Sequence, residues 1–237
     1  MEARKTILHS ADSDRTLVIM AKAPRAGSVK TRLAGNLTVE EVTELYSCFL
    51  EDTLLLAREI AHVEVAIVCP APDVEDLSRA VKNAVSVVPQ TGKGLAAGLT
   101  SVFAAFTDSA RRRVIAFNSD SPHLPARQLE TAFEILETRD VVVGPTHDGG
   151  YYLVGARASH PGLFSSAGMG TGTALDELLN RAGRQGLSVG LTEPFYDIDI
   201  ARDLSQLTEE LRRAPEKAPR TAKWLADWAA RSTGRSN

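Results

Sequence analysis

Residues 17–33, which read LVIMAKAPRAGSVKTRL, constrain this chain more than any other stretch. They begin with five apolar residues and then turn basic, with glycine and proline interspersed among four cations within eleven residues. An apolar run bounded by turn residues is typical of a buried parallel strand. A buried first strand that leads into a cationic, glycine-containing loop is the usual way for an α/β protein to bind phosphate.

This loop matches neither of the two familiar glycine patterns. Lys30 and Thr31 fit the end of the nucleoside-triphosphate loop G-x-x-x-x-G-K-[ST], but Val29 and Pro24 occupy its glycine positions. The dinucleotide pattern G-x-G-x-x-G fails as well, because Gly27 has no second glycine near it. We therefore interpret the stretch as a phosphate loop of another type, with a solvated basic turn as the alternative.

The bulk composition excludes several classes of protein. With 237 residues, 43% of them hydrophobic, the chain is long enough for one α/β domain with a sizeable core. A net charge of −3 does not support binding to nucleic acid. No apolar run approaches the ~20 residues of a membrane span. The two isolated cysteines, Cys48 and Cys69, lack the spacing of a metal site and favour a reducing cytoplasm.

Strand and helix patterns alternate for most of the chain, which predicts a mostly parallel sheet with helices on both faces. The strands flanking residues 148–150 are the expected antiparallel exception. Apolar runs predict strands at 17–21, 63–68, 85–88, 114–117, 141–143, 151–154 and 188–191. Helical spacing predicts helices at 38–61, 73–83, 95–106, 126–137, 174–182 and 201–213, with a last helix from 221.

We expect one domain over 17–213, preceded by a flexible leader over 1–16 that lacks the apolar segment of a signal peptide. A charged, proline-containing linker opens the last segment, 214–237, and Thr221 is expected to cap its helix. The apolar face of that helix, which carries Trp224 and Trp228, should dock on the domain, with a contact between subunits as the alternative. Residues 159–172 are rich in glycine and serine and are expected to form a mobile flap, and residues 111–113 a solvated arginine run.

Acidic residues follow several predicted strands at the edge where ligands bind in such sheets. Asp120 follows the fourth strand, Asp148 the fifth, and Asp197 and Asp199 the last. Mg²⁺ prefers oxygen ligands from carboxylates and substrate phosphates. Lysine and arginine side chains of the first loop would add positive charge at the same phosphate oxygens. This pattern favours a metal-dependent, phosphate-handling transferase, which needs no nucleophilic triad because positioning and electrostatics do most of the work.

Each acid also has a purely structural interpretation. Asp120 precedes Ser-Pro and could cap a turn, and Asp199 could be the N-cap of the helix that follows. Asp148, in Asp-Gly-Gly, could simply be a turn residue. Isolated histidines such as His123 and His147 are weak signals, so no role is assigned to them.

Four segments, AKAPRAGSVKTRL, NSDSPHLP, DGGYYLVG and FYDIDIARDL, together resemble the radical-SAM/selenodomain-associated transferase 1 family. This family belongs to the nucleotide-diphospho-sugar transferase superfamily, and the resemblance covers roughly residues 17–211. It implies a single-domain, GT-A-like (Rossmann-like) three-layer sandwich with a mostly parallel mixed sheet. The related 2-phospholactate guanylyltransferases share the K-T-R-L loop, which is Lys30 to Leu33 here.

The resemblance also implies a set of site residues. Lys30, Arg32 and Asp120 are the catalytic candidates, and Asp120, Asp197 and Asp199 would bind Mg²⁺ or Mn²⁺. The implied nucleotide-binding residues are Ala21, Lys22, Ala23, Pro24, Gly27, Lys30, Arg32, Gly94, Leu95 and Asn118. The implied acceptor-binding residues are Asp148, Gly149, Gly150, Tyr151, Gly172 and Thr173. The chain departs from the family pattern at 94–99, which lacks the usual polar residues, and at 169–173, where a Trp-Ser pair is common.

Three functions follow as expectations. The first is nucleotidyl transfer from a nucleoside triphosphate to a small phosphorylated acceptor with release of pyrophosphate, which the Lys/Arg loop favours. The alternative is glycosyl transfer from a nucleotide sugar to a small-molecule acceptor. A nucleotide-binding protein without turnover is the third, and the retained acids and basic loop argue against it. The sequence leaves the base, the acceptor and the oligomeric state open.

Overall fold

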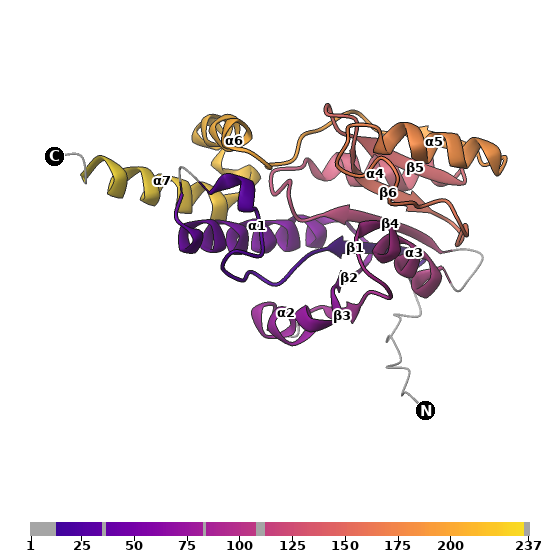
Figure 1. The fold of residues 1–237 in the computed structure, drawn as a ribbon, viewed down its shortest axis with the longest axis horizontal. Helices are drawn as coiled ribbons and strands as arrows, with labels where there is room; N and C mark the ends of the chain where they lie inside the picture. The colour runs from indigo at the N-terminus through magenta and orange to yellow at the C-terminus, as the bar shows by residue number, and fades with distance from the viewer. Residues whose placement is uncertain (1–12, 35–36, 83, 108–111, 235–237) are drawn as a thin grey trace.

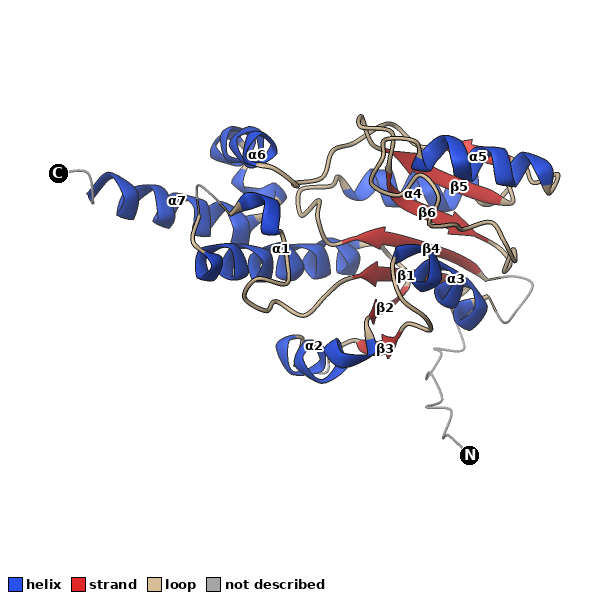
Figure 2. Cartoon of the chain, viewed as in Figure 1, coloured by secondary structure: helices blue, strands red, loops and turns tan. Residues whose placement is uncertain are grey.

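A computed structural model describes residues 13–34, 37–82, 84–107 and 112–234 (Figure 1). Within these residues the chain forms a seven-stranded sheet of order β3-β2-β1-β4-β6-β5-β7 (Figure 2). Its strands are β1 (Arg15–Met20), β2 (Glu64–Cys69), β3 (Ser86–Pro89), β4 (Arg113–Asn118), β5 (Val141–Pro145), β6 (Tyr151–Ala156) and β7 (Val189–Leu191). Most of the leader expected at 1–16 lies outside the described residues.

The sheet is mixed, as predicted. Strands β1, β2, β3 and β4 pair in parallel, and so do β5 and β7. Strand β6 runs antiparallel to both of its neighbours, β4 and β5. This reversal brings the start of β6, at Tyr151, to the edge of the sheet where β4 and β5 end.

Helices cover both faces of the sheet, so the predicted three-layer arrangement is confirmed (Figure 2). Successive residues of β1 alternate between the layers, since Leu17 and Ile19 pack on one face and Val18 on the other. The first face packs against α1 (Val39–Glu59), α2 (Val74–Ala80) and α4 (Ala126–Ile135). The other packs against α3 (Leu95–Phe106) and α5 (Ala174–Arg184). None of the described helices combines the length and apolar character needed to cross a lipid bilayer.

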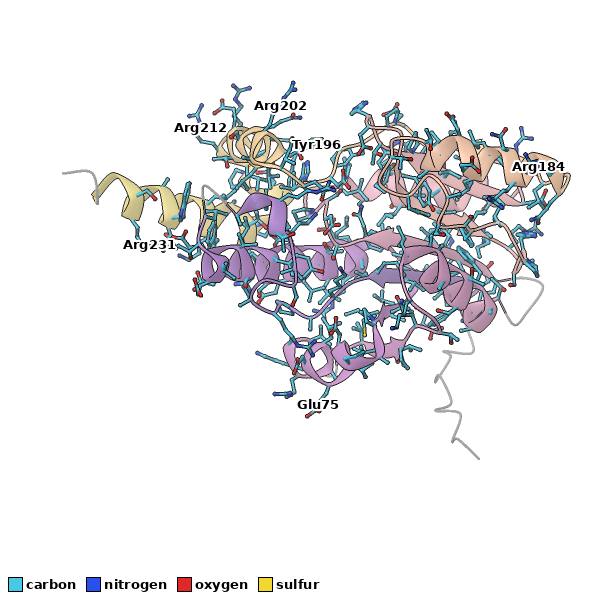
Figure 3. All side chains as sticks on the ribbon, in the orientation of Figure 1. Glu75, Arg184, Tyr196, Arg202, Arg212 and Arg231 are labelled. Atoms are coloured by element: carbon cyan, nitrogen blue, oxygen red, sulfur yellow. The ribbon has the colours of Figure 1, made fainter. Side chains whose placement is uncertain are left out.

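A smaller core lies beyond the sheet, where α6 (Ala201–Arg213) and α7 (Pro219–Gly234) pack on α1 (Figure 1). Phe49, Leu207 and Leu225 are buried in it. The rings of Trp224 and Trp228 stack with centroids 6.3 Å apart beside this core. On the opposite side of α6 the arginine side chains project outward, Arg202 and Arg212 among them (Figure 3). The apolar face of the last helix therefore docks on the domain.

The sequence predictions for the start of the last helix and for the arginine run were wrong. Helix α7 begins at Pro219, inside the predicted linker, and Thr221 is not its cap. Its first turn is capped by the buried carboxylate of Asp52 in α1, which accepts hydrogen bonds from the backbone N–H groups of Arg220 (3.0 Å) and Thr221 (2.8 Å). Arg112, expected in a solvated run, is only 8% exposed and donates to Glu64 at 2.9 Å; Arg111 lies outside the described residues.

The ends of the first two helices lie close to their predicted positions. A capping box starts α1, with Thr38 and Glu41 each accepting the other's backbone N–H. Helix α2 ends at Ala80, earlier than predicted, because Lys82 takes a left-handed conformation with φ 52°. Residues 159–172 form turns and bends, as their composition indicates, and their mobility stays a prediction.

Candidate functional site

A pocket of about 710 Å³ opens at the carboxyl edge of the sheet. Strands β1 and β4 are neighbours there, although β2 and β3 separate them along the chain. Such a switch point leaves a crevice beyond the strand ends, and ligands of α/β proteins bind there. The walls come from the first-strand loop, the start of α3, the start of β6 and the segment that precedes α6.

An ion cluster lies at one side of this pocket. The Nζ atom of Lys30 lies 3.0 Å from Oδ1 of Asp120 and 2.7 Å from Oδ1 of Asp199. The Lys30 side chain is only 6% exposed. Three segments that are far apart in the sequence therefore meet at one ammonium group. We call this ammonium and the three acids around it the Lys30 cluster, which consists of Lys30, Asp120, Asp197 and Asp199.

Backbone contacts hold these segments in place. The N–H of Ile198 donates to the carbonyl oxygen of Asp120 at 3.0 Å. The hydroxyl of Ser121 donates to the carbonyl oxygen of Tyr196 at 3.0 Å. The loop after β4 and the segment before α6 are thus joined on both sides of the acids. Lys30 itself has φ 46° and ψ 39°, a left-handed conformation that is uncommon for a residue other than glycine.

The carboxylates of Asp120 and Asp199 can face Lys30 because other side chains bond the backbone N–H groups of these two residues. Asp203, in the first turn of α6, reaches back with its carboxylate to accept from the N–H groups of Asp199 (3.0 Å) and of Ile200 (2.9 Å), which is the N-cap residue. Asp199 is therefore not the N-cap that the sequence allowed. After β4, the side-chain oxygen of Asn118 accepts from the N–H of Asp120 at 3.2 Å, so the carboxylate of Asp120 is not needed for that turn.

The electrostatics of the cluster favour a further cation. Burial alone would lower the pKa of Lys30, but the charges of Asp120 and Asp199 outweigh it and hold that pKa above its usual value. Burial, followed by the charge of Asp199, raises the pKa of Asp197 to about 6. Three carboxylates thus face one ammonium, and a second positive charge would stabilise their ionised forms.

These three acids could hold a metal ion. Asp120, Asp197 and Asp199 each offer one carboxylate oxygen, and the three atoms lie within 4.8 Å of one another. A purely oxygen donor set suits Mg²⁺ or Mn²⁺ rather than a soft transition metal. The chemistry of the residues present therefore fits the predicted metal site.

A buried tyrosine beneath the pocket joins two of its loops. The hydroxyl of Tyr46, in α1, accepts from the N–H of Lys22 at 3.1 Å and lies 2.9 Å from the hydroxyl of Ser119. Burial raises the pKa of Tyr46 to about 12, so this hydroxyl stays neutral. In the sequence, Tyr46 lies at an apolar position of the helix predicted over 38–61, and only its hydroxyl indicates a polar role.

The first-strand loop divides into two halves. Its first half is anchored to α2, since Arg25 donates to Asp76 (2.7 Å) and Asp73 accepts from the N–H of Ala23 (3.0 Å). Its second half, from Ser28 to Arg32, lines the pocket. The predicted nucleotide-binding residues at the pocket are Ala21, Lys22, Lys30, Arg32, Gly94, Leu95 and Asn118. Ala23, Pro24 and Gly27 are not among its lining residues.

Most of the predicted acceptor residues lie away from the pocket lining, which includes only Tyr151 from that set. Asp148 makes a local turn, since its carboxylate accepts from the Thr146 hydroxyl (2.5 Å) and the N–H of Gly150 (3.1 Å). Gly149 has φ 85°, and a Cβ there would meet the carbonyl oxygen of Gly172 at 1.9 Å. This turn therefore packs against the segment that leads to Thr173 and α5.

Residues 53–171, half of the chain, match the family described as "Uncharacterized protein conserved in bacteria (DUF2064)". A comparison with curated proteins finds no match. Among solved structures, the chain is similar to a candidate nucleotide-diphospho-sugar transferase from Desulfovibrio desulfuricans G20, with 26% identity and a TM-score of 0.84 over 92% of this chain and 96% of that one.

Two more distant structures share the fold alone. The 4-diphosphocytidyl-2C-methyl-D-erythritol synthase of Anaerococcus prevotii DSM 20548 is 11% identical, with a TM-score of 0.57 over 85% of this chain and 97% of that one. A nucleotidyl transferase from Methanothermobacter is 16% identical, with a TM-score of 0.55 over 84% of this chain and 98% of that one. Because the family model matches half of the chain, the chain belongs to the DUF2064 family.

Proposed function

We propose that this chain is a transferase that depends on a divalent metal ion and joins a nucleotide, taken from a nucleoside triphosphate, to a small phosphorylated acceptor. Pyrophosphate is the second product. The observation that carries the proposal is the Lys30 cluster, in which a buried ammonium and three carboxylates meet at the edge of a large pocket. Such an arrangement of charged groups suits phosphoryl transfer, because positioning and electrostatic stabilisation supply most of the catalysis in that reaction.

Two exposed cations support the choice of a triphosphate. Lys22 and Arg32 line the same pocket as the cluster, and their side chains are exposed. They are available to bind the β- and γ-phosphates, the arginine through two parallel hydrogen bonds. On the other wall Leu95, 47% exposed at the start of α3, offers an apolar surface for a nucleobase.

The reaction then follows from the placement of these groups. An oxygen of the acceptor phosphate forms a bond to the α-phosphorus, and the bond from that phosphorus to the bridging oxygen breaks. Pyrophosphate leaves with the electron pair, and Lys22 and Arg32 stabilise its charge. A divalent ion held by Asp120, Asp197 and Asp199 would neutralise charge on the phosphate oxygens.

Within the family, the sequence supports a narrower placement. The K-T-R-L loop from Lys30 to Leu33 and the DGGYYLVG segment are similar to those of the radical-SAM/selenodomain-associated transferases. The same loop is similar to that of the 2-phospholactate guanylyltransferases. Both likenesses support a nucleotide donor bound over the first-strand loop.

A thermal-shift panel tests the donor. The protein is heated with Mg²⁺ and, in separate samples, each nucleoside triphosphate and each common nucleotide sugar. A donor at a hundred times its dissociation constant should stabilise the fold by about 2.7 kcal/mol, which is roughly 5–10 °C for a domain of this size. We expect one triphosphate to give this shift. Stabilisation by nucleotide sugars and by no triphosphate would contradict the proposal.

Glycosyl transfer from a nucleotide sugar is the second candidate. It is favoured by the likeness to the Desulfovibrio protein described as a nucleotide-diphospho-sugar transferase, which is 26% identical over 92% of this chain. The two reactions differ in their products, because only nucleotidyl transfer releases pyrophosphate. A coupled pyrophosphate assay on candidate acceptors, with the stabilising donor from the panel, separates them.

A further inference from the structure

Lys30 differs from the other cations of the pocket in its surroundings. Its ammonium is 2.7 Å and 3.0 Å from the Oδ1 atoms of two acids that would bind the metal. The side chains of Lys22 and Arg32, from the same loop, are exposed and line the pocket. One cation of the loop is thus bound to the carboxylates, whereas its neighbours face the ligand space.

We infer that Lys30 and a divalent metal ion compete for the carboxylates of Asp120 and Asp199, so that Lys30 is a built-in cation exchanged for the metal when the donor binds. The inference rests on the proposed function and adds an order of events to it. In this view Lys30 keeps three neighbouring acids together until the metal takes over that task.

The competition follows from the geometry of the oxygens. Mg²⁺ binds carboxylate oxygens at 2.0–2.1 Å, shorter than the ammonium contacts of 2.7 Å and 3.0 Å. An ion bound to the same Oδ1 atoms would therefore lie against the ammonium, and two cations in contact repel each other. Binding of the metal weakens both ion pairs of Lys30, and by linkage the ion pairs weaken binding of the metal.

The triphosphate gives the displaced ammonium a new partner. Lys30 itself lines the pocket, between the exposed side chains of Lys22 and Arg32 in the sequence. A rotation of its side chain toward the pocket would carry its charge from the carboxylates to the phosphates. Metal and triphosphate then bind cooperatively. The metal releases Lys30 from the carboxylates so that it can bind the phosphates, and the phosphates hold Lys30 away from the carboxylates that bind the metal. Free metal should bind weakly.

Direct measurement of Mn²⁺ binding tests the competition without any nucleotide. Isothermal titration with Mn²⁺ is carried out on the wild type, on Lys30→Met, which keeps the length of the side chain and removes its charge, and on Lys22→Met as the matched control. We expect Lys30→Met to bind Mn²⁺ at least tenfold more tightly than the wild type, and Lys22→Met to stay within about twofold of it. Adding Asp120→Asn to Lys30→Met should abolish the gain. Equal or weaker binding by Lys30→Met, or no binding by either protein, overturns the inference.

A second measurement uses the wild type alone and so does not depend on how a variant folds. The chain is treated with an amine-acylating reagent with and without saturating Mn²⁺, and the labelling rate of each lysine is followed by mass spectrometry. Mn²⁺ should raise the rate at Lys30 several-fold and leave Lys22, the internal reference, unchanged. An unchanged rate at Lys30 contradicts the exchange. Because neither experiment contains a nucleotide, their outcome is independent of the thermal-shift panel that tests the donor.

Discussion

Two acidic regions lie at the same edge of the sheet and differ in what their carboxylates do. In the Lys30 cluster, Asp120 and Asp199 come from separate segments and share one ammonium. In the turn between β5 and β6, Asp148 bonds to Thr146 and Gly150, its own near neighbours in the sequence. Both regions follow strands, and both contain acids that the sequence marks as candidates.

The two regions differ in which group satisfies the backbone near the acid. Asn118 bonds the N–H of Asp120, and Asp203 bonds the N–H of Asp199. No such helper serves Asp148 within the described residues, and its own carboxylate accepts from the N–H of Gly150. The helper residues Asn118 and Asp203 are therefore part of the proposed site through the backbone groups that they bond.

The largest expected effect separates the two regions by activity. Asp120→Asn removes a charge from the Lys30 cluster, and we expect pyrophosphate release to fall by about 10²–10³-fold, the usual loss when a charge-stabilising group is removed. Asp148→Asn is the matched control and should lower the rate by less than about threefold, because its side-chain oxygen can still accept the turn hydrogen bonds. The measurement is kcat/KM for the triphosphate. Comparable losses of kcat/KM in the two variants would show that the Lys30 cluster and the turn around Asp148 do not differ in their importance for the reaction.

A pH effect on stability is expected on the side of the Lys30 cluster. His123 packs against Phe195 and Tyr196, with ring centroids 4.8 Å and 4.6 Å away, in the segment that leads to Asp197. Burial lowers the pKa of His123 to about 4, against the opposing charge of Glu210. Between about pH 6.5 and pH 4 the unfolded chain binds the proton and the folded chain does not, so stability falls as the pH falls through this window.

The loss from this one group should approach about 3 kcal/mol at pH 4. His123→Phe should remove that part of the pH dependence, since neither ring nitrogen of His123 makes a hydrogen bond in the part of the chain that the structure describes. Urea unfolding at pH 7 and at pH 4.5 on the wild type and the variant measures the difference. An identical pH dependence in both proteins would show that His123 is not the group that titrates.

The smallest expected effect tests the helper residues. Asp203→Ala removes the hydrogen bonds to the N–H groups of Asp199 and Ile200 and should lower the free energy of unfolding by about 1 kcal/mol. It should also weaken Mn²⁺ binding, because the freed N–H groups of Asp199 and Ile200 draw the Asp199 carboxylate away from the cluster. Asp203→Asn, which can still accept those hydrogen bonds, is the control. A loss of stability with unchanged affinity for Mn²⁺ would show that Asp203 stabilises the start of α6 but does not position Asp199 for the metal.

The fold was largely predictable because the spacing of apolar residues along the sequence indicates which side chains are buried and in which type of element. Apolar runs located all the strands of the described sheet, and the predicted α3 and α6 coincide with the observed helices. The antiparallel pairing of β6 with β4 was not predicted, because strand partners depend on contacts far apart in the sequence. The cap of α7 by Asp52 was missed for the same reason, as 168 residues separate Asp52 from Arg220.

The site was predictable where strand topology alone places residues. Lys30, Asp120, Asp197 and Asp199 all line one pocket. Lys30 and Asp120 follow the neighbouring strands β1 and β4, whereas Asp197 and Asp199 reach the pocket from the segment between the edge strand β7 and α6. The sequence could not indicate that Lys30 is bound to the acids, nor that Tyr46 ties the loops together, because both depend on side-chain packing. It also could not show that Asp148 is occupied by its own turn, since Asp-Gly-Gly fits a turn and a ligand site equally well.

The most direct test of the account is to locate the metal and the nucleotide together. Crystals grown with Mn²⁺ and a non-hydrolysable triphosphate, chosen from the thermal-shift panel, would give an anomalous signal at the metal. The account predicts a peak within bonding distance of the carboxylate oxygens of Asp120 and Asp199, bridged to the phosphates, with Lys30 turned toward the nucleotide. A nucleotide bound away from these acids, or a metal peak at the turn around Asp148, would contradict it.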